Sequence, residues 1–348
     1  MKRTHGGDWA SFIDRYGTDP LDFSANISPL GLPESVRAAI AAALTEADRY
    51  PDRDCRALRA ALAAHESIPE LWLLCGNGAA DLIWRAVLAA KPKHALLTVP
   101  CFSEYEAALE AGGCEIRYWP LTQPFILTEQ ILSCIGRDLD LMILCNPNNP
   151  TGCTIEADLL RRIVRRCEET GVRLLLDECF IDFLEEPEHH TAKTLLESSS
   201  RLLILRAFTK FYGLAGVRLG YGMCADRTFL TAMDLAGPPW SVSALAQAAG
   251  LAALGDRDYA ERLRTLIRTE RSRLKKALEE LDLRVIPGEA NFLLFSSDQP
   301  LTEPLAARGV LIRSCGDFRG LDECWYRVGV RTREDNDRLI EVLREVLT

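Results

Sequence analysis

The sequence has little of several features that mark particular classes of protein. No apolar run reaches 18 residues, so a membrane-spanning helix is not expected. The basic N-terminal stretch has no apolar segment behind it, so we expect no signal peptide. Basic residues are in deficit, with 41 Lys and Arg against 50 Asp and Glu and a net charge of −9. Affinity for nucleic acid or acidic membranes is therefore disfavoured, although a local arginine pocket could still bind a small anion.

Closely spaced cysteine pairs are also missing, although the chain has twelve cysteines. No two of them have the C-x-x-C spacing that zinc and redox motifs use. Most follow or interrupt apolar runs, where a thiol behaves as a small hydrophobic group. We therefore expect reduced core cysteines in a cytoplasmic protein, without a metal site.

What the sequence does have is a long alternation of strand-like and helical segments. Its 348 residues are too many for one compact core, which favours two lobes. The apolar strand candidates are residues 94–99, 139–145, 172–177, 201–208 and 217–223, and the helix candidates between them are 79–90, 103–112 and 156–171. Continuous apolar strands separated by amphipathic helices predict an α/β fold with a mainly parallel sheet that is covered on both faces.

The pattern changes after about residue 237. A long charged helix is predicted at 258–281, followed by strand candidates at 283–288, 290–295, 309–313 and 325–330 and by a last helix at 336–348. The first 46 residues contain a helix at 33–47 but lack a core of their own. We predict a large domain at 47–237 and a small discontinuous α+β domain made of 1–46 and 238–348.

Polar residues stand where several predicted strands end. Asn149, Asp177 and Lys210 each follow an apolar strand, and residues 78–80 lead from glycines into a helix. Each residue has an ordinary explanation when taken alone: a helix cap, a turn, or a solvated lysine. Because ligands of such folds bind at the carboxyl ends of the strands, we expect these groups to meet in one crevice.

Together these groups match the needs of pyridoxal 5'-phosphate (PLP). Its aldehyde needs a lysine amine, which Lys210 supplies. Its ring nitrogen stays protonated only beside a carboxylate, such as Asp177. Its phosphate suits a helix start that is backed by an arginine, and Arg218 lies eight residues after Lys210. The sequence therefore predicts PLP as the cofactor.

The motifs also resemble those of a known family. The stretches AFTKFYGLAGVRLGY, NPNNPTG, LLDECFIDF and DRYPD resemble the aspartate-aminotransferase fold family of PLP enzymes, fold type I, in order and spacing over essentially the whole chain. The resemblance implies a seven-stranded, mainly parallel sheet in the large domain, with a smaller α+β domain beside it. Each motif alone is a moderate signal, whereas the ordered set is a strong one.

The resemblance implies a role for each cofactor residue. Lys210 would bond the cofactor aldehyde, Asp177 would pair with the ring nitrogen, and Asn149 would bond the phenolic oxygen. Phe102 would stack on the ring, although without the resemblance a core aromatic is the favoured interpretation. The phosphate would be bound by the backbone amides of Ala79 and Ala80 and by the side chains of Thr209 and Arg218.

Three further positions bear on the resemblance. Tyr50, in DRYPD, would reach the phosphate from a second subunit, which implies a homodimer with shared active sites. Many family members have a phosphate-binding serine where this chain has Ala207, so one hydroxyl contact is missing here. Many aminotransferases also have a tyrosine where this chain has Phe180, so its contact with the phenolic oxygen cannot form.

Within the family the chain resembles two groups, the histidinol-phosphate aminotransferases and the L-threonine-O-3-phosphate decarboxylases of cobalamin biosynthesis. The second match is closer, through residues 5–7, 21–33, 239–246 and 310–315 and through Phe180. It implies decarboxylation of L-threonine O-3-phosphate to (R)-1-aminopropan-2-yl phosphate. The phosphorylated amino-acid substrate would be bound by His5, Gly6, Asn26, Asn149, Arg313 and Arg327.

Several of these assignments have alternatives. His5 could lie in a loose tail and Arg313 on a strand surface. Alternation along a strand places Arg331 on the same face as Arg327, so periodicity cannot choose between them.

The reaction also stays open. The same cofactor residues would serve decarboxylation or transamination, depending on which bond of the substrate Cα stands perpendicular to the cofactor ring. Serine phosphate remains a candidate substrate, because one methyl group is worth only about 1–3 kcal/mol of discrimination. A non-catalytic binding protein on the same fold is a third hypothesis, which the intact set of cofactor residues disfavours.

Overall fold

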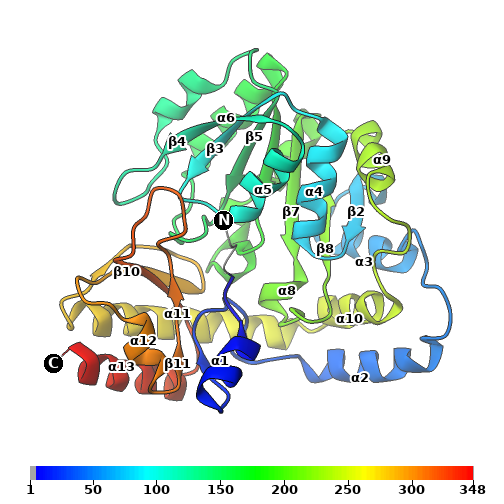
Figure 1. Cartoon of the computed structure of the whole chain (residues 1–348). Coiled ribbons are helices and arrows are strands. Elements are labelled where there is room, and N and C mark those ends of the chain that lie inside the picture. Colours follow the sequence, from blue (N-terminus) through cyan, green and yellow to red (C-terminus); the bar gives the residue numbers. More distant parts are fainter. Residues whose placement is uncertain (1–4, 348) are drawn as a thin grey trace.

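A seven-stranded sheet forms the centre of the computed structural model, which describes residues 5–347 (Figure 1). Its strands, in spatial order, are β2 (Leu73–Gly76), β8 (Gly220–Met223), β7 (Leu202–Ala207), β6 (Arg173–Asp177), β5 (Leu141–Cys145), β3 (His94–Val99) and β4 (Glu115–Pro120). β8 runs in the direction opposite to the other six strands. The predicted mainly parallel α/β sheet is confirmed. Within the described residues no helix is both long and apolar enough to span a membrane.

Helices cover both faces of this sheet because its central strands are apolar on both sides. All residues of β5, β6 and β7 are buried. One face packs against α4 (Ala79–Ala90), α5 (Ser103–Ala111) and α9 (Arg227–Leu235). The other packs against α3 (Arg56–Glu66), α6 (Ala157–Thr170) and α10 (Ala244–Gly255). Because both sides of these strands are buried, the strands end where the apolar run ends. The polar residues that follow are therefore positioned at the edge of the sheet.

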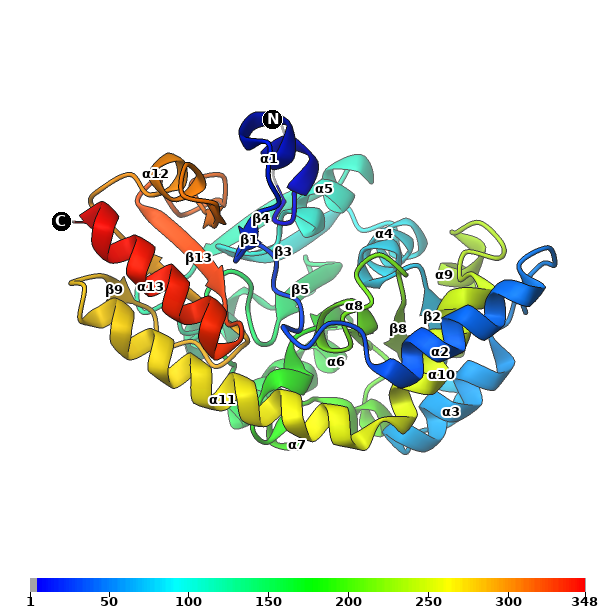
Figure 2. The same ribbon diagram turned by 90° about the horizontal axis from the view of Figure 1, so that it is seen from below.

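A second, antiparallel sheet lies beside the first. Its strands, in spatial order, are β12 (Arg313–Ser314), β13 (Trp325–Gly329), β10 (Phe292–Ser296) and β9 (Arg284–Val285). Three helices contribute to its core: α11 (Arg257–Glu279), α12 (Thr302–Ala306) and α13 (Arg333–Leu347). Figure 2 shows α11 running from α10 to the region of β9 and α13. The predicted last helix thus begins at Arg333, and residue 348 lies outside the described residues.

The N-terminal segment contacts both parts of the molecule. It contains α1 (Trp9–Tyr16) and β1 (Leu21–Asp22), which pairs in parallel with β11 (Val310–Leu311). Next comes α2 (Glu34–Ala43), which lies along α10 (Figures 1 and 2). Residues of α2 and α10 belong to the core on one face of the large sheet. The domain boundaries at 47 and 237 stay a prediction.

The remaining elements are short. Two are α-helical turns, α7 (Pro187–His190) and α8 (Phe208–Phe211), and five are 3-10 helices, η1 (Leu44–Glu46), η2 (Glu70–Trp72), η3 (Glu129–Cys134), η4 (Ile181–Phe183) and η5 (Lys193–Ser198). Of these, α8 matters most here because it directly follows β7 and contains Lys210.

Candidate active site

The carboxyl ends of β5, β6 and β7 open into a cavity of about 530 Å³. The second sheet contributes Arg313 and Arg327 to its wall, and the N-terminal segment contributes His5, Gly6 and Asn26. The large sheet and its helices contribute the other predicted residues, namely Ala79, Ala80, Phe102, Asn149, Asp177, Thr209, Lys210 and Arg218. The cavity thus collects every predicted site residue of the chain except Tyr50.

Lys210 is a partly buried amine in a cationic environment. Burial, and then the nearby Arg327, lower the pKa of Lys210 from 10.5 to about 8. Among the described residues, no carboxylate lies within ion-pair distance of its ammonium group. About a tenth of the amine is therefore neutral at pH 7, far more than for a lysine of ordinary pKa, which suits a nucleophile or a proton carrier.

Asp177 is held as a hydrogen-bond acceptor at the end of β6. The Tyr105 hydroxyl donates to one carboxylate oxygen at 2.6 Å, and the Cys179 amide donates to the other at 2.9 Å. Burial, and then Asp177, raise the pKa of Tyr105, so the phenol stays protonated as a donor. Sequence reasoning missed Tyr105. Its position three residues after Phe102, on one face of α5, is the signal that could have found it.

The start of α4 forms an anion site with Arg218. The N-cap residue Gly78 supplies no side-chain hydrogen bond, so the first amides of the helix remain available. A Cβ at Gly78 would lie 2.7 Å from Arg218 Nη2, so only glycine allows the guanidinium to approach this closely. Arg218 itself has a φ of 65°, a backbone strain that is typical of functional positions. Helix start, guanidinium and the nearby Thr209 fit a bound phosphate.

Two arginines from the second sheet line the same cavity. Arg313 and Arg327 are register partners on β12 and β13. Burial, and to a smaller extent Arg313, lower the pKa of Arg327 to about 10. Arg327 donates to Asn149 Oδ1 and, at 3.0 Å, to the Ser24 carbonyl, whereas Arg313 pairs with Asp317 at 2.8 Å. Two cations this close favour an anionic ligand between them.

Unmet hydrogen-bonding groups support this view of the cavity. The Nε of Arg327 and the Oδ1 of Asn26 are buried without a partner among residues 5–347. One is a donor and the other an acceptor. Because buried polar groups are nearly always satisfied, the pair indicates a polar ligand or water in the cavity.

Arg327 lines the cavity whereas Arg331 lies beyond the end of β13. This strand stops at Gly329, so its alternation does not extend to residue 331. Arg331 pairs instead with Asp335 at 2.9 Å and donates to the Asp22 carbonyl at 3.1 Å, outside the cavity.

The N-terminal residues close one side of the cavity. His5 Nε2 lies 3.2 Å from Glu104 Oε1, and its ring centroid is 6.1 Å from that of Phe102. Gly6 packs so closely on the Ser24 carbonyl that any Cβ there would collide with it. His5 thus lies at the cavity.

The two departures from the family pattern also line the cavity. Ala207 has no hydroxyl to offer, and Phe180 packs edge-on against Phe292 with ring centroids 5.0 Å apart. Other lining residues escaped the sequence reasoning, among them Glu104, Cys145, Cys179 and Phe318. All twelve cysteines are unpaired and nine are buried, whereas Cys101 and Cys134 are partly exposed and Cys324 is exposed.

Tyr50 lies apart from this site. Its side chain is 80% exposed and stacks on Trp240 with ring centroids 4.6 Å apart. Within one chain it does not line the cavity.

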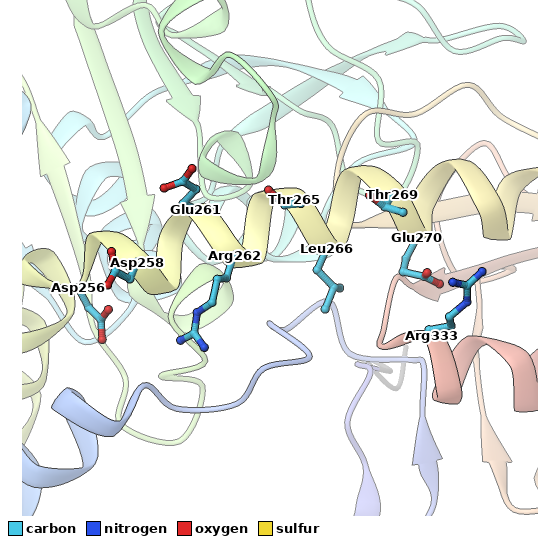
Figure 3. Close-up of a pocket in the computed structure, with 9 residues that line it drawn as sticks. All are labelled: Asp256, Asp258, Glu261, Arg262, Thr265, Leu266, Thr269, Glu270 and Arg333. Carbon is cyan, nitrogen blue, oxygen red and sulfur yellow. The ribbon is translucent and has the colours of Figure 1, made fainter.

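A larger surface groove, about 970 Å³ in volume, runs along α11 and lacks such a constellation (Figure 3). Arg262 and Leu266 point toward the N-terminal segment there, and Glu270 is already paired with Arg273 at 2.7 Å. The chemistry-bearing residues are therefore gathered in the smaller cavity at the strand ends.

Comparisons with known proteins agree with this geometry. The family model "Aminotransferase class I and II" matches residues 18–343. A threonine-phosphate decarboxylase of Salmonella typhimurium is 41% identical over 99% of this chain and 96% of its own. A histidinol-phosphate aminotransferase of Symbiobacterium thermophilum is 37% identical, over 94% and 91%. The solved structure of the histidinol-phosphate aminotransferase of Clostridium acetobutylicum superposes with a TM-score of 0.89 at 27% identity, over 93% and 98%. The chain belongs to the class I and II aminotransferase family of PLP-dependent enzymes.

Proposed function

We propose that this protein is a PLP-dependent decarboxylase that converts L-threonine O-3-phosphate to (R)-1-aminopropan-2-yl phosphate in cobalamin biosynthesis. The observation that carries the proposal is the pair Arg313 and Arg327, which lines one cavity together with Lys210. Such a pair suits a substrate with both a carboxylate and a phosphate. The 41% identity to a threonine-phosphate decarboxylase over nearly the whole chain supports the same assignment.

The cofactor would occupy the floor of the cavity. Lys210 would bond its aldehyde, Asp177 its ring nitrogen and Asn149 its phenolic oxygen, while Phe102 would stack on the ring. Its phosphate would bind the amides of Ala79 and Ala80 together with Thr209, Arg218 and a Tyr50 from a second subunit. Bound PLP supplies one thing, an acceptor for the electron pair of the bond that breaks at the substrate Cα.

The substrate would lie between the arginines and the N-terminal segment. Its phosphate and carboxylate would be bound by His5, the amide of Gly6, Asn26, Asn149, Arg313 and Arg327. The unmet donor of Arg327 and the unmet acceptor of Asn26 would both find partners there. These contacts would orient the substrate so that the bond from Cα to the carboxylate would break in preference to the Cα–H bond.

Lys210 would then move the proton. When the carboxylate leaves as carbon dioxide, the substrate Cα must gain one proton to give the amine product. A pKa of about 8 makes the Lys210 ammonium an effective donor near neutral pH. Transamination would instead need Lys210 to remove the Cα proton and a 2-oxoacid to accept the amino group.

We also propose that the enzyme is a cytoplasmic homodimer with active sites at the interface. The exposed stack of Tyr50 and Trp240, the latter 44% exposed, supports a second subunit at this surface. Trp240 and the half-exposed Leu71 also line a hollow of about 210 Å³.

A product assay tests the reaction. The purified holoenzyme is given L-threonine phosphate without any 2-oxoacid, and carbon dioxide and the phosphorylated amine are measured. Stoichiometric release of both over many turnovers is expected, with none from a Lys210→Ala variant. Turnover of histidinol phosphate that depends on a 2-oxoacid, without carbon dioxide release, would make the protein an aminotransferase. Parallel assays with L-serine phosphate measure the selectivity for the methyl group.

A further inference from the structure

A cluster of buried charges lies under the sheet, outside the cavity. We call it the buried ion cluster: Glu66 of α3, Glu178 after β6, Asp182 of η4, Lys193 of η5, Arg206 of β7, Tyr221 of β8 and Thr191. None of these residues lines the cavity. Glu66, Glu178 and Arg206 are 1%, 0% and 3% exposed, so the charges lie in the protein interior. The proposed reaction uses none of them.

Arg206 is the centre of this cluster. Its guanidinium lies 3.1 Å from Glu178 Oε2, 3.4 Å from Glu66 Oε1 and 3.5 Å from Asp182 Oδ1. Thr191 Oγ1 accepts from Arg206 at 3.0 Å and donates to Glu178 at 2.8 Å.

The rest of the cluster completes the coordination of the two glutamates. Glu178 also accepts from the amide of Ala192 at 2.8 Å. Glu66 accepts from the Tyr221 hydroxyl and pairs with Lys193 at 3.2 Å. Side chains of α3, β7, β8 and the segment that follows β6 are thus joined in one connected network.

Strand alternation places this network directly behind the cofactor residues. Asp177, the last residue of β6, faces the cavity, while Glu178, the next residue, contacts the cluster. On the next strand Arg206 faces the cluster while Ala207, three residues before Lys210, faces the cavity. The amide of Glu178 also donates to the Leu205 carbonyl at 2.9 Å. The Glu178–Arg206 pair therefore joins the ends of the two strands that present Asp177 and Lys210.

A buried ion network is a weak source of stability. Desolvation of each charge costs several kcal/mol, and apolar residues of similar volume often give a more stable core. A network of fixed hydrogen bonds can instead hold the backbone segments that it joins at a fixed distance from each other. Misplacement of reacting groups by about 1 Å is enough to cost a large factor in binding or rate.

We propose that Glu178 and Arg206 are positioning residues, which fix the spacing between Asp177 and Lys210 from the rear face of the sheet. This inference rests on the proposed cofactor site, because the spacing matters only if one bound cofactor must reach both residues. The cluster acts through the backbone of β6 and β7 and does not touch the ligand.

The chain contains a matched control for this proposal. Arg173, at the other end of β6, pairs with Asp226 at 2.9 Å, and its side chain is 9% exposed. Glu178→Gln and Asp226→Asn each neutralise a carboxylate that is paired with an arginine of the sheet, and each changes the shape of the side chain little. Only the first lies behind the cofactor residues.

The test measures cofactor affinity and stability separately. PLP dissociation constants are determined by equilibrium titration of the apoproteins, and unfolding of the same apoproteins by urea. Both variants are expected to lose stability. Only Glu178→Gln is expected to weaken PLP binding, by about tenfold or more. Thr191→Val, which removes the bridging hydroxyl and leaves the charges in place, is expected to weaken it by a smaller factor.

Equal PLP affinities in Glu178→Gln and Asp226→Asn would overturn the proposal, because the cluster would then contribute to stability alone. If Glu178→Gln does not fold, Thr191→Val is judged against Asp226→Asn by the same criterion. Failure of the cofactor assignment itself is recognised separately, since the unaltered apoprotein would then not bind PLP at all.

Discussion

At the scale of single residues, the site is a set of charges that the protein alone does not balance. Lys210, Arg218, Arg313 and Arg327 line one cavity whose carboxylates in the wall are Glu104 and Asp177, and Arg313 is also paired with Asp317. The remaining excess of positive charge in the cavity lowers the stability of the folded protein without its ligands. This excess of positive charge is consistent with two anionic ligands, a cofactor phosphate and a phosphorylated substrate.

The cost of burying Lys210 can be measured in the apoprotein. Below pH 8 its amine is charged in both the folded and the unfolded protein, and the folded state carries the full penalty. Between pH 8 and 10.5 the unfolded chain binds the proton that the folded one has released, so this penalty is relieved as pH rises. A pKa drop from 10.5 to about 8 corresponds to about 3 kcal/mol. Lys210→Met is therefore expected to stabilise the apoprotein at pH 7, by up to that amount, and much less at pH 10.

Urea unfolding of both apoproteins at the two pH values checks this expectation. Lys275→Met serves as the control, because that lysine lies on the surface of α11 in an ion pair with Glu279. It should change stability by less than about 0.5 kcal/mol. Equal stability of wild type and Lys210→Met at pH 7 would show that the amine is well solvated.

The different surroundings of two arginines give a second prediction. Arg327→Gln removes a buried guanidinium from the cavity, so kcat/KM for L-threonine phosphate should fall by about 100-fold or more. Arg331→Gln alters an arginine that is bound to Asp335 outside the cavity, so kcat/KM should stay within about threefold. Steady-state kinetics with both variants, after circular dichroism has shown that they fold, decide the point. A reversed order would mean that the substrate binds elsewhere.

At the scale of elements, the start of α4 and the loop that carries Arg218 form a unit that depends on close packing. Gly78 has a φ of +81°, and a Cβ there would meet the Arg218 guanidinium. Gly78→Ala should therefore displace Arg218 and weaken PLP binding by about tenfold. Gly171 offers a control, since its φ is +82° and nothing lies within 4 Å of its would-be Cβ. Gly171→Ala should destabilise the fold by about 1 kcal/mol with unchanged PLP affinity.

Titration of both apoproteins with PLP, together with urea unfolding, separates backbone strain from displacement of the arginine. Loss of affinity in both variants would mean that strain alone is responsible. No loss in either would remove the helix start from the phosphate site.

Sequence patterns predicted some elements better than others, for physical reasons. Strands β3, β5, β6 and β7 are runs of buried apolar residues, which a sequence displays directly. The edge strand β4, at residues 115–120, was missed because none of its residues is fully buried and no apolar run marks it. The two-residue pairing of β1 with β11 was also missed, since it joins segments almost 290 positions apart, Leu21 and Val310, without a local signal.

The candidate site shows the same division. Residues that end a buried strand, such as Asp177, were predictable because their place in the fold follows from the strand itself. Tyr105 and Glu104 were not, because they reach the cavity from a helix whose rotation is set by packing. The position of Arg331 depended on where β13 stops, and element ends are poorly marked in a sequence.

At the scale of the whole molecule, Tyr50 is the predicted site residue that does not line the cavity of its own chain. An aromatic side chain with 80% exposure, stacked on another that is 44% exposed, is unusual on a free surface. In the proposed homodimer it would contact the cofactor phosphate of the partner subunit. We expect a particle of twice the chain mass of 38.8 kDa in analytical ultracentrifugation.

Mixed dimers test whether Tyr50 acts across the interface. Tyr50→Phe should weaken PLP binding in both sites of its own dimer, and Lys210→Met should abolish activity in both sites of its own. If Tyr50 serves the partner's site, a dimer with one subunit of each kind contains one site with both Lys210 and Tyr50. Near-half activity should then return at a PLP concentration that leaves the Tyr50→Phe dimer mostly empty. If Tyr50 serves its own chain, every site of the mixed dimer lacks one of the two residues. Activity at that PLP concentration would then stay near the level of the Tyr50→Phe dimer, and the shared-site arrangement would be wrong.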